Sequence, residues 1–75
     1  MHKEFLRKGL SSKISHAVEE CGEFIQAAGK TLRFGPESAN PLLPLTEQET
    51  NKTWLLREMN DLRLTLAMLE LELMK

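Results

Sequence analysis

The sequence predicts an all-α fold, an antiparallel helical hairpin that completes a four-helix-type bundle by oligomerisation. In two long segments apolar residues recur at spacings of three and four, and a Gly-Pro pair with a proline-rich stretch separates the segments. With 75 residues the chain forms a single domain, and domains this small bury only about 60% of the surface of their unfolded chain. Because Cys21 is the only cysteine, no disulfide within one chain can replace a larger core.

The first helix is predicted over residues 11–34, with room for an extension back to Glu4. Its apolar residues fall on one broad face: Leu6, Leu10, Ile14, Ala17, Val18, Cys21, Phe24, Ile25, Ala28 and Leu32. Gly35 can adopt the left-handed conformation that ends a helix, and Pro36 cannot continue one. The helix is therefore expected to stop at Phe34.

A loop is predicted over residues 35–45 and a second helix over 46–74. Thr46 is the expected N-cap, and Glu49 three residues later would complete a capping box. One heptad-like row of apolar residues contains Leu55, Met59, Leu62, Leu66, Leu69 and Leu73, and a second contains Leu56, Leu64, Met68 and Leu71. Since one facing helix cannot cover both rows, we expect a homodimer or a homotetramer.

Charge and composition exclude several classes of partner. A formal net charge of -1 lacks the basic excess that nucleic-acid binding needs, and tyrosine is absent from a chain with few aromatic residues. No apolar run approaches the roughly 20 residues of a membrane span. The first twenty residues lack the apolar segment of a signal peptide, so a cytoplasmic location is expected.

Acidic residues form two pairs with helical spacing. Glu23 and Glu20 lie 11 and 14 residues before Phe34, while Glu58 and Asp61 lie 11 and 14 residues after Glu47. At a rise of about 1.5 Å per residue, both pairs sit roughly 16–21 Å from the hairpin end. Antiparallel helices would bring the four carboxylates to one height, beside the apolar rows and at the edge of the helix–helix contact.

Such a cluster is unfavourable without a cation. Two like charges about 4 Å apart repel by roughly 1 kcal/mol in water and by more in a partly buried site. Mg²⁺ prefers oxygen ligands and often bridges carboxylates to phosphates, and Mn²⁺ is a possible substitute. The alternative is that these residues belong to an ordinary solvated helix surface, since 11 of the 75 residues are acidic.

The segments EECGEFIQAAGKTLRFG and REMNDLRLTLAMLE, with the proline-rich loop between them, resemble the MazG-like all-α NTP pyrophosphatases. The nearest likeness is to short members from phages and prophages. The second motif of that family usually reads E-L-G-D where this chain has EMND, so Asn60 adds a side chain. The resemblance implies a helical bundle assembled by dimerisation.

The resemblance also implies roles for individual residues. Glu20, Glu23, Glu58 and Asp61 occupy the positions of the family's metal-binding carboxylates. Glu20 and Glu23, with Glu19 as a helper, are the expected catalytic groups that position water. Lys30 and Arg33 match basic positions that would meet substrate phosphates, although near a helix end they could simply complement the dipole.

Two aromatic or heterocyclic side chains have open roles. Trp54 could contact a nucleobase or pack the start of the second helix against its neighbour. His16 lies one turn before Glu20 and could join a metal site or contact that carboxylate.

The expected function is that of a hydrolase acting on acid anhydrides: Mg²⁺-dependent cleavage of a nucleoside triphosphate to the monophosphate and pyrophosphate. The alternative is a non-catalytic helical oligomerisation or interaction protein, or a nucleotide-binding protein, that retains the fold. Larger members of the family carry a further C-terminal helix with substrate ligands, which keeps this alternative open. Neither the base nor the sugar of the nucleotide is indicated.

Overall fold

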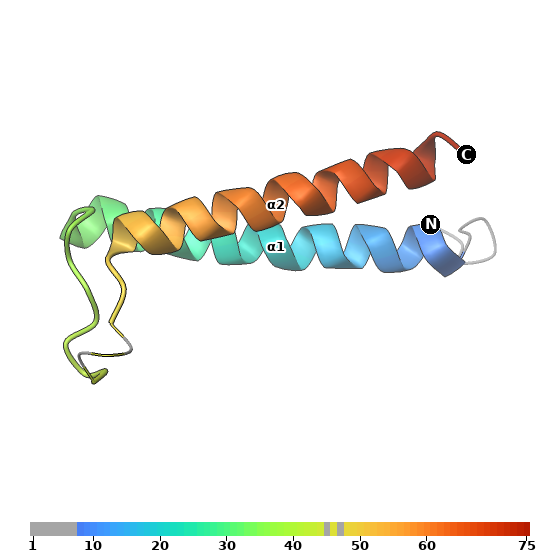
Figure 1. Cartoon of the computed structure of the whole chain (residues 1–75). Helices are drawn as coiled ribbons and strands as arrows, with labels where there is room; N and C mark the ends of the chain where they lie inside the picture. Colours follow the sequence, from blue (N-terminus) through green and yellow to red (C-terminus); the bar gives the residue numbers. More distant parts are fainter. Residues whose placement is uncertain (1–7, 45, 47) are drawn as a thin grey trace.

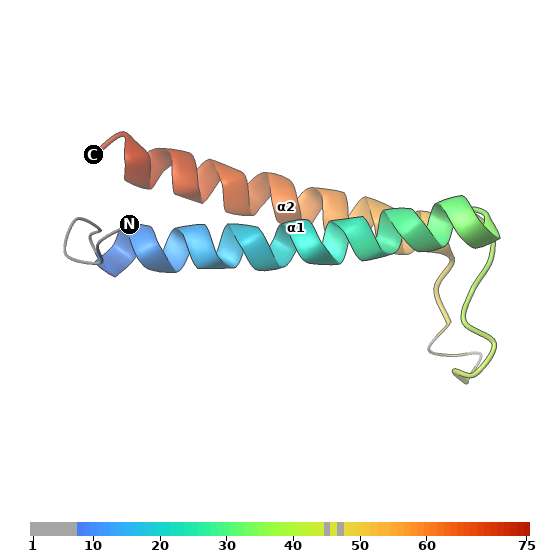
Figure 2. The same cartoon turned by 180° about the vertical axis from the view of Figure 1, so that it is seen from behind.

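The computed structural model describes residues 8–44, 46 and 48–75. Helix α1 (Lys8–Phe34) and helix α2 (Asn51–Leu73) run antiparallel side by side, so the start of α1 and the end of α2 lie at the same end of the hairpin (Figures 1 and 2). The described residues form no strand beyond an isolated bridge between Ala39 and Thr50. The all-helical hairpin is therefore confirmed.

Helix α1 ends where the sequence predicts. Gly35 has a φ of 90°, and its amide donates to the carbonyl of Thr31 at 2.9 Å. This left-handed residue closes the last turn after Phe34, because glycine adopts positive φ without a steric cost. The helix begins at Lys8, three residues before the predicted start, and the suggested extension to Glu4 lies outside the described residues.

The predicted start of the second helix is wrong. Helix α2 begins at Asn51 rather than at residue 46, and its N-cap is Thr50, whose hydroxyl accepts from the amide of Thr53 at 3.2 Å. The loop supplies the next acceptors, because the amides of Asn51 and Lys52 donate to the carbonyls of Ser38 and Pro36, both at 2.8 Å. These bonds satisfy the first amides of a helix that begins at residue 51. The loop accordingly runs to residue 50.

The line of contact between the helices is largely polar. The buried residues of α2 recur at every seventh position and are Asn51, Glu58, Thr65 and Glu72. Among the described residues, the only buried apolar side chains belong to Ala17 and Ala27 of α1. The expectation that all four carboxylates lie at the edge of the helix contact is therefore wrong for Glu58, which is buried within it.

Most of the polar groups on this line bond within the hairpin. The hydroxyl of Thr65 donates to the carbonyl of Asp61 at 2.8 Å, one turn earlier on the same helix. The Asn51 amide donates to the carbonyls of Gly35 at 3.0 Å and Lys30 at 3.4 Å, which ties the start of α2 to the end of α1. Asn51 thus has a structural role.

Many of the larger apolar side chains are exposed. On α1 the row of Val18, Ile25 and Leu32 is 66%, 66% and 89% exposed, and on α2 Leu66 and Leu73 of the predicted seam are 46% and 58% exposed. Val18 and Leu66 each follow directly after a buried residue of the helix contact, Ala17 in α1 and Thr65 in α2. Because the helices are right-handed and antiparallel, equal rotations place both rows on the same side of the hairpin. We call this side the apolar face.

A pair of threonine substitutions tests the observed start of α2. Thr50→Ala should lower the free energy of unfolding by about 1 kcal/mol, because the first turn loses its side-chain cap. Thr46→Ala should change it by less than about 0.5 kcal/mol, since Thr46 is exposed and lies before the helix. Urea denaturation measures both values. A larger loss for Thr46→Ala than for Thr50→Ala would contradict the assigned cap.

Candidate metal centre

The register of the hairpin brings the two acidic motifs together. Asn51 lies opposite Lys30, where its amide reaches the Lys30 carbonyl. From that point α1 runs back to Glu23 and Glu20 while α2 runs forward to Glu58 and Asp61. Because the rise per residue is the same in both helices, the two motifs meet at one height.

Three carboxylates form the cluster at this height. Glu20, Glu58 and Asp61 each offer one oxygen, and these oxygens all lie within 4.8 Å of one another. Glu20 comes from α1 and the other two from α2, so the cluster depends on the packing of the hairpin. The matched level predicted from the sequence is confirmed for these three residues.

Two oxygens of the cluster are buried without a donor. Oε2 of Glu20 and Oε2 of Glu58 find no hydrogen-bond partner within the described part of the chain. The opposite oxygens do have neighbours: Oε1 of Glu20 lies 3.3 Å from Nε2 of His16, and Oε1 of Glu58 lies 3.4 Å from Nη1 of Arg57. Buried charged oxygens without a partner are costly, and a bound cation would relieve that cost.

Burial raises the pKa of the Glu58 carboxyl above its ordinary value. The negative charge of Glu23 adds to this increase in pKa, while the nearby Arg57 opposes it. Desolvation and like charges both disfavour the ionised carboxylate in the absence of a cation. The positive charge of Arg57 therefore offsets only part of the cost of ionising Glu58.

The two remaining predicted carboxylates are exposed, and one of them, Glu23, is a direct neighbour of Glu58, whose pKa it raises by its charge and by a side-chain hydrogen bond. Glu23 is exposed, and although it influences Glu58 it is not one of the three residues whose oxygens converge within 4.8 Å. Glu19 is also exposed and outside that group. His16 contacts Glu20, in agreement with one of its two expected roles, and its position can orient that ligand.

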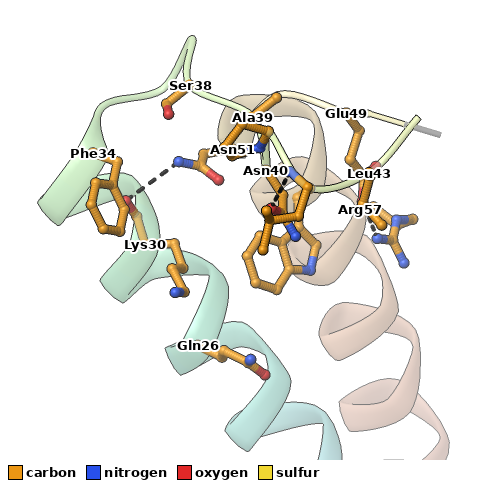
Figure 3. Close-up of a pocket in the computed structure, with 13 residues that line it drawn as sticks. Gln26, Lys30, Phe34, Ser38, Ala39, Asn40, Leu43, Glu49, Asn51 and Arg57 are labelled. Carbon is orange, nitrogen blue, oxygen red and sulfur yellow. Dashed lines mark hydrogen bonds and ion pairs between the residues drawn. The ribbon is translucent and has the colours of Figure 1, made fainter. Parts of the chain in front are cut away.

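A cavity of about 860 Å³ adjoins the helices at the loop end (Figure 3). Its walls come from the end of α1, the loop and the start of α2, and include Lys30, Phe34, Trp54 and Arg57. This volume lies within the range of small-molecule sites, which combine apolar walls with a few polar groups. Trp54, which is half-buried, therefore lines a pocket as well as packing at the start of α2.

The two predicted phosphate contacts have different surroundings. Lys30 lines the cavity, with its Nζ 5.5 Å from the centre of the Phe34 ring. Arg33 lies over the same ring, with Cζ 5.9 Å from its centre, and is not part of the cavity wall. Of these two residues only Lys30 is thus brought to the pocket, because Arg33 points about 60° away from Lys30 around the axis of α1, on the side opposite to Phe34.

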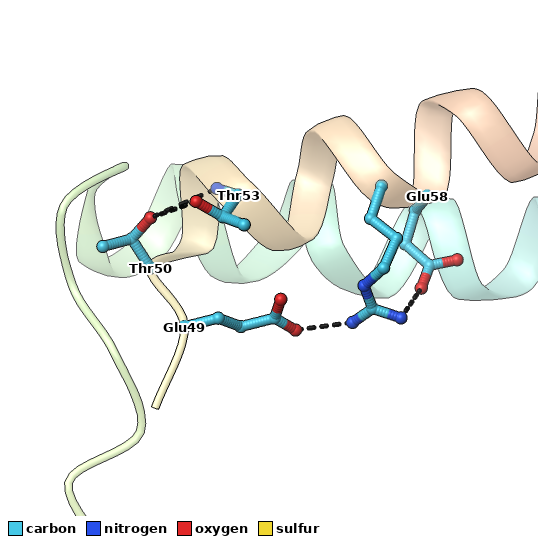
Figure 4. A network of polar contacts seen from close by, with 5 residues as sticks. Glu49, Thr50, Thr53 and Glu58 are labelled. Carbon is cyan, nitrogen blue, oxygen red and sulfur yellow. Dashed lines mark hydrogen bonds and ion pairs between the residues drawn. The ribbon is translucent and has the colours of Figure 1, made fainter. Parts of the chain in front are cut away.

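Arg57 was missed by the sequence analysis. Its guanidinium contacts Glu49, in the loop before α2, and Glu58 in the cluster (Figure 4). Since Arg57 also lines the cavity, it connects the carboxylates to the pocket. The sequence offered one signal, the R-E pair at 57–58, but the reach to Glu49 depends on a loop conformation that the sequence does not specify.

The donor set fits a hard divalent cation. All three ligand atoms are carboxylate oxygens, which Mg²⁺ and Mn²⁺ accept, and the group contains no thiolate or imidazole. Oxygens bound to Mg²⁺ at about 2.1 Å are at most about 4.2 Å apart, so small side-chain rotations would bring the cluster into range.

No protein family model, curated protein or solved structure matches this chain. Within the described residues, neither helix is both long enough and apolar enough to cross a bilayer.

The raised pKa of Glu58 predicts a pH-dependent stability. A carboxyl whose pKa is higher in the folded state binds its proton more tightly there, so stability is lost as the pH rises above 4.5 and through the folded pKa. Glu58→Gln removes this loss, and we expect the metal-free variant to gain about 1 kcal/mol at pH 7. Urea denaturation across pH in a chelating buffer measures the difference.

Glu70→Gln is the matched control, because Glu70 is an exposed glutamate on the same helix. Its free energy of unfolding should stay within about 0.5 kcal/mol of wild type. A Glu58→Gln variant that is no more stable than Glu70→Gln would contradict the described burial of Glu58.

Proposed function

We propose that this chain is a Mg²⁺-dependent nucleoside triphosphate pyrophosphohydrolase, which releases pyrophosphate and the monophosphate, with Mn²⁺ as a possible substitute. The supporting observation is the carboxylate cluster, in which two buried oxygens lack donors among the described residues and Glu58 connects through Arg57 to a pocket. The resemblance of the two acidic motifs to MazG-like enzymes agrees with this assignment.

In this proposal Glu20, Glu58 and Asp61 hold the metal. When bound, Mg²⁺ neutralises phosphate charge and polarises the phosphoryl group. Glu23 is exposed beside the cluster, so it can accept a proton from water that attacks the phosphorus, with Glu19 as a helper. Lys30 reaches the polyphosphate from the cavity wall, and Trp54 offers an aromatic surface to the base.

The apolar face is proposed to bind a second copy of the chain. The hairpin has almost no apolar core of its own, since Ala17 and Ala27 are the only buried apolar residues described. Rows with heptad-like spacing on both helices form a surface that a second hairpin can cover, giving a four-helix bundle as a homodimer or, by repetition, a homotetramer.

A cytoplasmic location is also proposed. A single exposed thiol at Cys21 suits a reducing cytoplasm.

The apolar face also favours a second candidate, a non-catalytic oligomerisation or interaction protein, or a nucleotide-binding protein. Such a protein would need the face but no metal. The two candidates differ in one observable, which is pyrophosphate release from a triphosphate.

The catalytic proposal predicts the release of pyrophosphate and a loss of turnover when a metal ligand is replaced. A panel of canonical and modified nucleoside triphosphates with Mg²⁺ should yield pyrophosphate from at least one nucleotide. Asp61→Asn should reduce turnover by about a hundredfold or more, because it removes a charged ligand and changes little volume. The exposed Glu70→Gln should keep wild-type turnover. If no triphosphate yields pyrophosphate with Mg²⁺ or Mn²⁺, the interaction protein becomes the better account.

The assembly proposal predicts that one charge introduced into the apolar face will dissociate the oligomer. Ile25→Glu places a carboxylate in the apolar face, so it should shift the chain toward monomers that lose helicity at micromolar concentration. Ser12→Glu adds the same charge at an exposed position on the other side of α1 and should leave the oligomer intact. Light scattering with circular dichroism measures both properties. A wild-type chain that is a folded monomer would refute the proposed interface.

A further inference from the structure

Arg57 links two carboxylates that lie in different environments. Its Nη2 is hydrogen-bonded to Glu49, which is partly exposed, and its Nη1 lies 3.4 Å from Oε1 of Glu58, whose side chain is only 5% exposed. The contact with Glu58 is longer than a good hydrogen bond between charged groups. The guanidinium is therefore held mainly by Glu49 and can leave Glu58 without losing its stronger partner (Figure 4).

We propose that Arg57 is an exchangeable counter-ion of the carboxylate cluster. It neutralises Glu58 while no metal is bound, and it turns toward the polyphosphate of the substrate when a divalent cation takes its place. This inference rests on the proposed function, because it requires the cluster to bind a metal and the pocket to receive phosphate.

Electrostatics require the first half of this exchange. The guanidinium stays charged at any ordinary pH, so it competes with a cation for Glu58 without a protonation step. A divalent ion at the cluster would also repel a positive charge only a few ångströms away. Arg57 should therefore weaken the binding of metal alone.

The position of Arg57 favours the second step of the exchange, in which Arg57 binds the polyphosphate. It lines the cavity together with Lys30, and its bond to Glu49 keeps it at that wall after it leaves Glu58. Arginine is suited to this task because its planar group binds phosphate oxygens through two parallel hydrogen bonds. Arg57 should therefore strengthen the binding of the metal–polyphosphate complex, an effect of opposite sign to its effect on metal alone.

The first measurement is Mn²⁺ affinity without nucleotide, determined by electron paramagnetic resonance of the free ion. Arg57→Gln should bind Mn²⁺ about fivefold more tightly than wild type, because one competing charge is gone. Arg57→Lys keeps the charge and should stay near wild type. Arg63→Gln makes the same change of charge on another side of α2, so its affinity should change by less than about twofold.

The second measurement is calorimetric titration with Mg²⁺ and inorganic tripolyphosphate, which requires no knowledge of the base. Arg57→Gln should bind this complex about tenfold more weakly than wild type, despite its tighter hold on metal alone. A purely structural role for Arg57 would weaken both ligands together.

The outcomes separate this inference from the proposed function. If Arg57→Gln binds Mn²⁺ no more tightly than wild type, or binds the polyphosphate complex as well as wild type, the exchange is refuted while the metal centre stands. If neither wild type nor Arg57→Gln binds Mn²⁺, the metal centre and the exchange fall together.

Discussion

The polar line of contact between α1 and α2 is the constraint on which the rest of this structure depends. At every seventh position of α2 a polar residue faces α1, and the buried apolar residues described on the other side are two alanines. Small and polar side chains let the helices approach, but they contribute little hydrophobic stabilisation. Several larger apolar residues consequently lie on the apolar face, where the proposed second hairpin would supply the missing core.

The same constraint creates the carboxylate cluster. If Leu66 and Leu73 of α2 faced α1, Glu58 would be turned away from the contact by roughly 60–80° and could be hydrated. Instead it is buried beside Glu20, and each keeps one oxygen without a donor among the described residues. An arrangement that removes hydration from acidic groups is unfavourable for stability alone, and local violations of this kind are typical of functional sites.

The sequence predicts the meeting of the acidic motifs correctly, although the predicted start of α2 is wrong. The prediction set Glu47 against Phe34, whereas Asn51 lies opposite Lys30, four residues farther along one helix and four residues earlier along the other. The register is the same in both cases. Helix α1 continues beyond Lys30 by about as many residues as the predicted second helix began too early. The two differences cancel, so the predicted register is correct.

The start of α2, the row of α2 that faces α1 and the reach of Arg57 depend on contacts that residue spacing alone does not determine. The sequence predicts Thr46 as the cap, whereas the helix begins after Thr50, where the loop carbonyls of Pro36 and Ser38 accept from the first amides of α2. The apolar periodicity of α2 reveals its rows but not which of them the neighbouring helix covers. The reach of Arg57 to Glu49 likewise follows from the path of the loop rather than from sequence distance.

We propose that the buried carboxylates of the hairpin are ligands for a divalent cation. The most direct test is the free energy of unfolding of the wild-type chain as a function of Mg²⁺ concentration, at fixed protein concentration and ionic strength. Ligand binding to the folded state should raise it steadily, by about 2.7 kcal/mol at a hundredfold excess over Kd, and Glu58→Gln should lose most of this gain. The proposal would be contradicted if the free energy of unfolding of the wild type did not change with Mg²⁺ and therefore responded no differently from that of Glu58→Gln.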